Sequence, residues 1–236
     1  MKALFLTQSY WGEAKTALCF NWPSWFLSSL CLCYLLAPIL NLLCRRMRRY
    51  AIYGIMLVCG GLIFLGTFWY YDAAVNGAGY YYMYLCPWIR LLDFIAGILM
   101  AYVYQVYENR DARCNVRGYS RFEALIFLIV ILSLKSQAFI PEIYRWSVMW
   151  LPISLGMVWS FACLRGRFTV YLSGLAWLRW LGSRSFELYI VHRMILVFFA
   201  RHGHPGWTYL LTVLATIIVA EIAHGWQGNL REKVQR

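Results

Sequence analysis

The chain has 236 residues, of which 62% are hydrophobic and 14% are charged, and its formal net charge is +12. Soluble domains are about 45–50% apolar and about 25% charged, so this composition excludes an ordinary soluble protein and indicates an integral membrane protein. The basic residues lie in short clusters between apolar runs. This arrangement favours orientation signals and contacts with membrane lipid over nucleic-acid binding.

Seven apolar runs are long enough for spanning helices, which need about 20 mostly apolar residues. They cover residues 24–43, 50–70, 88–107, 122–140, 146–164, 181–200 and 207–226. The aromatic stretch 168–180 would form only about 20 Å of helix, too little to cross, so we expect it to be interfacial or re-entrant. The predicted fold is an all-α polytopic membrane protein, with a single membrane domain over residues 1–236.

Arginine residues concentrate in alternate connections between these runs. The richest clusters are Arg45, Arg46, Arg48 and Arg49 after the first run, and Arg165 and Arg167 after the fifth. The positive-inside rule places these connections and the C-terminus in the cytoplasm. With seven spans, Met1 is then expected outside.

The eight cysteines form no Cys-x-x-Cys pair and mostly lie in apolar runs. This pattern predicts small buried side chains rather than metal ligands. We therefore expect no metal site.

The run 181–200 carries the most unusual polar residues. We expect a Trp-Leu-Gly turn at 180–182, followed by a helix. His192 lies about 16 Å from the start of this helix, which places it near the centre of the bilayer. Ionisable residues at that depth indicate function. Ser185, Tyr189 and His192 share one face, and His192 could act as a general base or proton relay. The alternative is a structural imidazole, and Glu187 could simply pair with Arg184.

Two other spans contribute candidate polar groups. Trp25 and Ser28 lie in the first turns of a helix that begins after Pro23. Arg90 and Asp93 are one turn apart at the entry of the third span. They predict either an ion pair that holds helices together or the lining of a polar vestibule.

Three segments together resemble the membrane-bound acyltransferase 3 family, which includes O-acetyltransferases of bacterial polysaccharides. The sequence PSWFLS at 23–28, with YLLAP at 34–38, is similar to the family's WxLS…YLLxP helix. The sequence LDFIAGILMA at 92–101 is similar to its FxxGxxxA helix. The sequence WLGSRSFELYIVH at 180–192 resembles its WLGxxSYxLYxxH segment.

The resemblance implies about ten helices in the bacterial cytoplasmic (inner) membrane. It also implies an acyl-CoA donor that is a substrate rather than a bound cofactor, and transfer of an acyl group, typically acetyl, to a hydroxyl of a cell-envelope carbohydrate. The family begins with three further helices that carry the His usually assigned to catalysis. Nothing here matches them, so we expect this chain to be the C-terminal part of the family domain, N-terminally truncated. Phe26, Leu30 and Phe186 depart from the family pattern.

The resemblance implies that the principal base lies on the missing helices, and that His192, Tyr189 and Ser185 line the acceptor or donor channel as secondary hydrogen-bonding groups. Within this chain His192 is the candidate catalytic residue, and the candidate substrate-binding residues are Ser185, Tyr189, Arg193, Trp25, Ser28, Asp93 and Arg90. The guanidinium groups that could hold the phosphates of coenzyme A, because Arg suits bidentate phosphate contacts, are those of Arg45, Arg46, Arg48, Arg49, Arg165 and Arg167. Their alternative role is as topology signals only.

Two other functions remain open. The chain could be an inactive relic, or half of a split enzyme that works with a separate N-terminal partner. It could also be a transporter that uses Glu187, His192 and Arg193 as a proton path. The sequence has no pair of broken helices in matching halves, which argues against a transporter.

Overall fold

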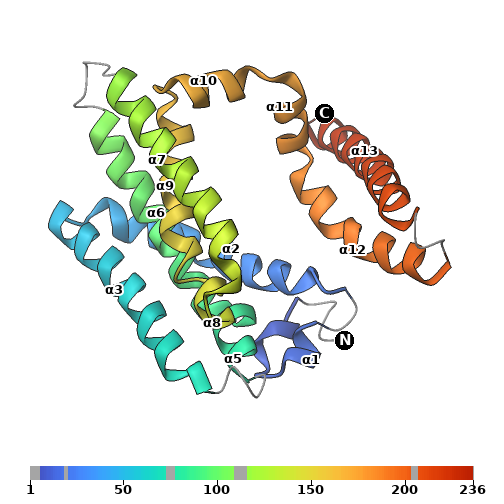
Figure 1. The fold of residues 1–236 in the computed structure, drawn as a ribbon, viewed down its shortest axis with the longest axis horizontal. Helices are drawn as coiled ribbons and strands as arrows, with labels where there is room; N and C mark the ends of the chain where they lie inside the picture. Colours follow the sequence, from blue (N-terminus) through green and yellow to red (C-terminus); the bar gives the residue numbers. More distant parts are fainter. Residues whose placement is uncertain (1–5, 19–20, 73–77, 109–115, 203–206, 236) are drawn as a thin grey trace. The chain divides into compact units, whose positions relative to one another are not determined.

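The computed structural model describes residues 6–18, 21–72, 78–108, 116–202 and 207–235. Within these ranges the chain forms helices and no β-strand (Figure 1). The expectation of an all-α protein is confirmed.

The chain forms two compact units. Unit 1 comprises Met1–Cys19 and Trp25–Leu172, and unit 2 comprises Phe20–Ser24 and Ser173–Arg236. The single membrane domain expected over residues 1–236 stays a prediction.

The long helices of unit 1 form where the apolar runs predict them. They are α2 (Ser24–Arg45), α3 (Arg49–Trp69), α6 (Pro87–Glu108), α7 (Val116–Lys135) and α9 (Trp150–Cys163). Helix α6 is central, because α3 and α9 both pack against it, and α7 packs against α9 (Figure 1). Short helices join them: η1 (Gln8–Tyr10), α1 (Ala14–Ala17), α5 (Ala78–Tyr80), η2 (Tyr81–Leu85), η3 (Ser136–Ala138) and α8 (Glu142–Trp146).

Five helical segments of the described chain are long and apolar enough to cross a membrane. They are Ser24–Arg45, Arg49–Trp69, Tyr81–Tyr107, Glu142–Cys163 and Thr208–Trp226. Helices also form at the two other predicted positions, but α7 and α12 (Ser185–His202) each carry three or more charged residues. The protein is therefore a multi-pass membrane protein, and the predicted count of seven spans is not confirmed.

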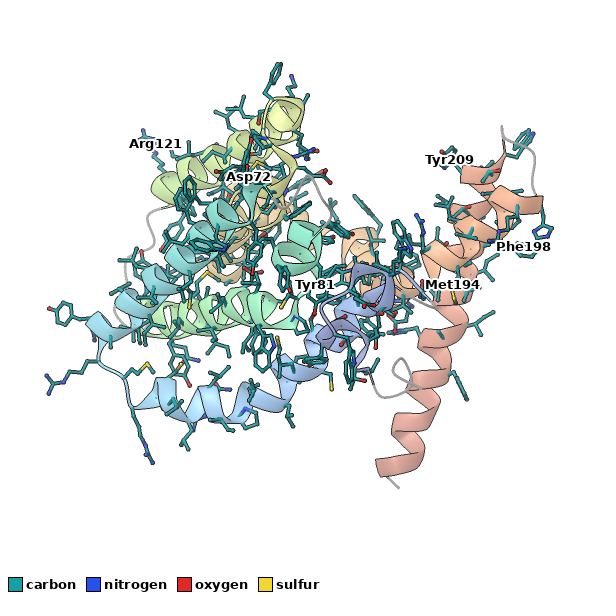
Figure 2. All side chains as sticks on the ribbon, turned by 90° about the horizontal axis from the view of Figure 1, so that it is seen from below. Asp72, Tyr81, Arg121, Met194, Phe198 and Tyr209 are labelled. Carbon is teal, nitrogen blue, oxygen red and sulfur yellow. The ribbon has the colours of Figure 1, made fainter. Side chains whose placement is uncertain are left out.

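Unit 2 contains α11 (Ala176–Ser183), α12 and α13 (Thr208–Gln235), and α12 and α13 lie side by side (Figure 1). Large apolar side chains on both helices, including Phe198 and Tyr209, are exposed, as side chains that face lipid would be (Figure 2). Helix α13 extends nine residues beyond the predicted end at 226, because residues 227–235 include several good helix formers.

The local structure before α12 differs from expectation in two details. The stretch 168–180 is two helices, because Leu175 has an extended backbone that separates α10 (Arg167–Gly174) from α11, and its interfacial or re-entrant placement stays a prediction. The Trp-Leu-Gly turn is also absent: Trp180, Leu181 and Gly182 are helical in α11, and the break falls at Arg184. Strong helix formers before Gly182 let the helix continue past the expected turn.

A buried carboxylate caps the start of α10. Glu123 of α7 accepts hydrogen bonds from the backbone N–H groups of Phe168 at 3.1 Å and Thr169 at 3.4 Å, and from the Thr169 hydroxyl. The first N–H groups of a helix lack partners within the helix, and they favour a negative charge. Glu123 therefore fixes the connection between α9 and α10 against α7.

Candidate active site

The polar centre of unit 1 is an ion pair near the start of α6. The Nη1 atom of Arg90 lies 2.7 Å from Oδ2 of Asp93. The Nη2 atom of Arg90 also donates to the backbone oxygen of Met83 at 2.8 Å and to the hydroxyl of Ser147. Arg90 therefore joins η2, α6 and the α8–α9 connection, and its guanidinium is held in place by charge-assisted hydrogen bonds.

Two polar atoms of this ion pair have no hydrogen-bond partner among the described residues. They are Oδ1 of Asp93 and Nε of Arg90, and both are buried. A buried polar atom left unpaired costs about 1–3 kcal/mol. The site is therefore suited to a ligand that brings a hydroxyl or another polar group to Asp93.

A mostly apolar groove of about 620 Å³ runs between α2 and α6 and includes the ion pair. We call it the α2–α6 groove; it is lined by Trp25, Phe26, Ser29, Leu30, Cys33, Arg90, Asp93, Phe94, Gly97, Ile98 and Ala101. From Arg90 to Ala101 the helix rises about 16 Å. The groove is thus long, with apolar walls and one polar end. Sites for ligands with an apolar arm and a polar head have this character.

A second groove, of about 310 Å³, lies on the other side of the same ion pair. We call it the α6–α9 groove. Arg90, Asp93 and Gly97 line both grooves, and Trp146 and Trp150 line the second. The ion pair therefore stands where two hollows meet.

Residues from two of the sequence motifs meet in the α2–α6 groove. Trp25 comes from the first motif, and Phe94, Gly97 and Ala101 come from the second. Ser28 lies elsewhere: it is fully buried, and its hydroxyl donates to the backbone oxygen of Leu6 at 2.6 Å. The structure thus brings Trp25, Arg90 and Asp93 together, while the Ser28 hydroxyl is used in holding the N-terminal segment.

The arginine clusters lie at the connections, and most of their side chains are exposed. Arg45, Arg46, Arg48 and Arg49 are all exposed between α2 and α3. This connection lies near the later turns of α6, because Cys44 packs in one cluster with Leu99. It is therefore nearer to the Ala101 end of the α2–α6 groove than to the Arg90 end.

Arg165 and Arg167 are the cluster between α9 and α10. Arg167 is exposed, and its backbone N–H donates to the Ser120 hydroxyl at 3.1 Å. Arg165 is half-buried, and it donates to the Tyr119 hydroxyl at 3.2 Å. Arg165 is therefore committed to contacts with α7, whereas the side chain of Arg167 faces solvent.

The candidate catalytic histidine belongs to unit 2. The Nδ1 atom of His192 lies 2.6 Å from the backbone oxygen of Tyr189. A carbonyl oxygen only accepts hydrogen bonds, so Nδ1 carries the hydrogen and, in the neutral ring, Nε2 carries the basic lone pair. His192 is thus oriented by its own helix with Nε2 as the atom available to take a proton.

The other predicted residues of α12 differ in their surroundings. The Tyr189 ring lies 5.9 Å from the His192 ring, so these two are neighbours as expected. Ser185 is exposed, and its hydroxyl donates back to the Gly182 oxygen at 2.9 Å. Ser185 therefore stabilises the start of α12 through a local bond.

Arg193 has a partner that sequence reasoning missed. Its guanidinium lies 4.2 Å from the centre of the Trp22 ring, a cation–π contact. Beside it, the amide Nδ2 of Asn21 donates to the backbone oxygen of Ile190 at 3.0 Å. The segment 20–24 is thereby attached to α12. In the sequence, the only signal for this attachment was the cluster of Asn, Trp and Pro before the first span.

Glu187 does not form the pair with Arg184 that was the alternative to a functional role. Arg184 instead pairs with Glu221 of α13, with Nε at 2.5 Å from Oε1 and Nη2 at 3.0 Å from Oε2. Glu187 lies 3.2 Å from Nδ1 of His224. Glu187 thus links α12 to α13, and Glu221 links α13 to Arg184, just before α12. No local sequence pattern predicts either contact.

The comparisons with known proteins agree on one family. The family model described as an acyltransferase domain, of the acyltransferase 3 type, matches residues 3–223. A stretch of 107 residues is 28% identical to a Bacillus subtilis (strain 168) protein named "Putative peptidoglycan O-acetyltransferase YrhL". That stretch is 43% of this chain and 17% of the relative, so the chain matches only a small part of that protein. No solved structure matches this chain.

Proposed function

Because this chain belongs to the acyltransferase 3 family, we propose that it transfers an acyl group from acyl-CoA to a hydroxyl of a bacterial cell-envelope carbohydrate. The acyl group that we propose is acetyl. The observation that carries this proposal is the Arg90–Asp93 pair at the junction of two grooves, with one carboxylate oxygen unpaired. The name of the Bacillus subtilis relative supports a carbohydrate acceptor. We place the protein in the cytoplasmic membrane with its C-terminus in the cytoplasm.

The reaction needs an activated hydroxyl and a positioned thioester. The hydroxyl oxygen attacks the thioester carbonyl carbon, the new C–O bond forms, and the C–S bond breaks. The hydroxyl proton passes to a base, and the departing coenzyme A thiolate takes up a proton. A positioned general base contributes about 10²- to 10⁴-fold. Within unit 2, Nε2 of His192 is the candidate atom to take a proton, and Tyr189, Ser185 and Arg193 are further candidate hydrogen-bonding groups on α12.

The α2–α6 groove fits the donor. Its apolar walls suit the acyl group and the arm that carries it, and its length along α6 is about 16 Å. The exposed Arg45, Arg46, Arg48 and Arg49 near its far end are suited to the phosphates of coenzyme A. Arg167 is a further exposed candidate, whereas Arg165 already bonds Tyr119.

The Arg90–Asp93 pair fits the acceptor. The unpaired Oδ1 of Asp93 can accept a hydrogen bond from a sugar hydroxyl, because no described residue already occupies it. The fixed guanidinium of Arg90 holds the carboxylate in one orientation. Correct orientation of the hydroxyl is itself a large part of catalysis in transfer reactions.

The test uses membranes that contain the chain, radiolabelled acetyl-CoA, and peptidoglycan from which O-acetyl groups have been removed with mild base. We expect base-labile label in the polymer, and we expect Asp93→Asn to lose most of it at equal protein level. Label no higher than in membranes without the chain would overturn the proposal.

A further inference from the structure

A third hollow in unit 1 has a different chemistry from the two grooves. It measures about 420 Å³, and we call it the aromatic hollow. Four aromatic and three polar residues line it: Tyr80, Tyr84, Trp146, Trp150, Gln137, Glu142 and Arg145. Tyr80 and Tyr84 come from the connection 71–87, and Gln137, Glu142 and Arg145 come from the connection 135–145. Both connections are poor in arginine, so the positive-inside rule predicts that they lie outside, and η2 and α8 are in contact.

The aromatic rings of this hollow hold one another in place. Tyr80 and Tyr84 are stacked, with ring centres 5.3 Å apart and planes 26° apart. Tyr80 also meets Trp146 edge to face at 5.3 Å. Tyr84 is supported from behind by Trp25 at 4.9 Å. Aromatic side chains have few rotatable bonds, so this wall offers large apolar faces at little entropic cost on binding.

The polar residues of the hollow offer both donors and acceptors. Glu142 supplies a carboxylate, Gln137 an amide and Arg145 a guanidinium whose buried Nε has no hydrogen-bond partner among the described residues. The charges of Glu142 and Arg145 cancel, which favours an uncharged ligand. Burial, and then the neighbouring Tyr84 and Glu142, raise the pKa of Tyr80, so its phenol stays a hydrogen-bond donor.

We propose that the aromatic hollow binds an uncharged pyranose unit of the acceptor carbohydrate, an inference that rests on the proposed function. One face of a pyranose ring carries only C–H groups, whose hydrogens are slightly positive and match the electron-rich face of an aromatic ring. The hydroxyls at the ring edge need polar partners, and a few such groups in an aromatic pocket give orientation and specificity. The aromatic hollow combines both features.

The position of the hollow supports the same assignment. Trp146 and Trp150 line the aromatic hollow and also the α6–α9 groove, in which Arg90 and Asp93 lie. The two tryptophans are thus a wall shared by the hollow and the candidate active site. An oligosaccharide that crosses this wall has one unit in the aromatic hollow and another at Asp93. The hollow would therefore select the glycan and set which hydroxyl is acylated.

The test measures sugar binding without any need for turnover. Purified protein in lipid nanodiscs is titrated calorimetrically with chitotetraose, an uncharged oligosaccharide. Tyr80→Leu removes one stacked ring, and Glu142→Gln removes one charge from an exposed side chain with little risk to folding. We expect each to weaken binding at least 10-fold. The matched control is Tyr209→Leu, an exposed tyrosine of unit 2, which should bind as the parent does (Figure 2).

Two results would overturn this assignment: no chitotetraose binding by the parent chain, or equal affinity in the parent and both hollow variants. An unchanged thermal unfolding midpoint shows that the variants are folded. Failure of the proposed function looks different. In that case sugar binding still depends on Tyr80 and Glu142, but no acetyl group reaches the peptidoglycan in the membrane assay.

Discussion

The indole Nε1 of Trp180 donates a 2.6 Å hydrogen bond to Oε1 of Glu221, and this bond joins α11 to α13. The same carboxylate pairs with Arg184, whose guanidinium lies 5.1 Å from the Trp180 ring centre. Glu221 thus joins the side chains of Trp180 and Arg184 at the point where the helix breaks between α11 and α12.

Trp180→Phe tests that junction. The substitution keeps an aromatic ring beside Arg184 but removes the indole donor to Glu221, so we expect a lower thermal unfolding midpoint. The measurement is the thermal unfolding midpoint in detergent. Trp177→Phe, an exposed tryptophan on the same helix, is the control and should leave the midpoint unchanged. Equal midpoints for the two variants would contradict the role of Trp180.

Gly166→Ala tests the cap of α10. A Cβ at Gly166 would lie 2.0 Å from the carboxylate of Glu123, so this side chain must move and lose its bonds to α10. We expect a destabilisation of about 0.5–2 kcal/mol, the usual cost of a lost helix cap. Gly174→Ala is the control, because nothing lies within 4 Å of the added atom.

A double-mutant cycle separates this mechanism from a general effect of alanine. In the Glu123→Ala background the clash and the cap are both gone, so Gly166→Ala should cost almost nothing. Additive losses of unfolding free energy would show that Gly166 acts through some other neighbour.

Asp93→Asn tests the acceptor side of the proposed reaction. Asparagine keeps the shape but not the charge, so the hydroxyl loses a charge-assisted hydrogen bond, is oriented less well, and has a less nucleophilic oxygen. We expect kcat/KM for the carbohydrate to fall at least about 10-fold, which corresponds to about 1.4 kcal/mol of lost transition-state stabilisation. Asp72→Asn, an exposed residue of unit 1, is the control. Transfer at the parent rate would remove Asp93 from the site.

His192→Ala tests the candidate base. We expect acyl transfer to fall by about 10²- to 10⁴-fold with normal membrane insertion, because the proton would then pass only to solvent. His202→Ala is a closely matched control, since Nδ1 of His202 also meets a carbonyl oxygen of its own helix, that of Phe198 at 3.0 Å. If both variants transfer acetyl equally well, His192 has only a structural role.

The arginines between α2 and α3 have two candidate roles, and lysine substitution distinguishes them. Replacing Arg45, Arg46, Arg48 and Arg49 together by Lys keeps the positive charge that orients the chain but removes the bidentate guanidinium. We expect the KM for acetyl-CoA to rise several-fold, while the KM for the carbohydrate and the side of the C-terminus stay the same. An unchanged KM for acetyl-CoA would leave these residues as topology signals.

The sequence predicted most of the helices, because apolar runs of about 20 residues are a local signal. The contact between Arg90 and Asp93 was also predictable, since residues three apart face each other on a helix. The break at Leu175 was not, because Leu has no tendency to end a helix and the neighbouring Gly174 is the only local hint.

The partners of the polar residues were the least predictable part of the site. Glu123 was counted within an apolar run, yet it caps a helix 45 residues later in the chain. Arg184 pairs with Glu221 rather than with Glu187, which is only three residues away in the sequence. The reason is that α13 brings the carboxylate of Glu221 within reach of Arg184. Such contacts depend on which helices pack together, and that information is not contained in any single segment.

The bond from Asn21 to Ile190 joins residues 169 positions apart, and this separation sets an order of events during synthesis. Chains are made at about 5–20 residues per second, so the segment around Asn21 must wait about 10–30 s before α12 exists. During that interval Trp22 and Asn21 have no native partner in unit 2. The residues around Asn21 therefore reach their native contacts within unit 2 only after most of this sequence has been synthesised.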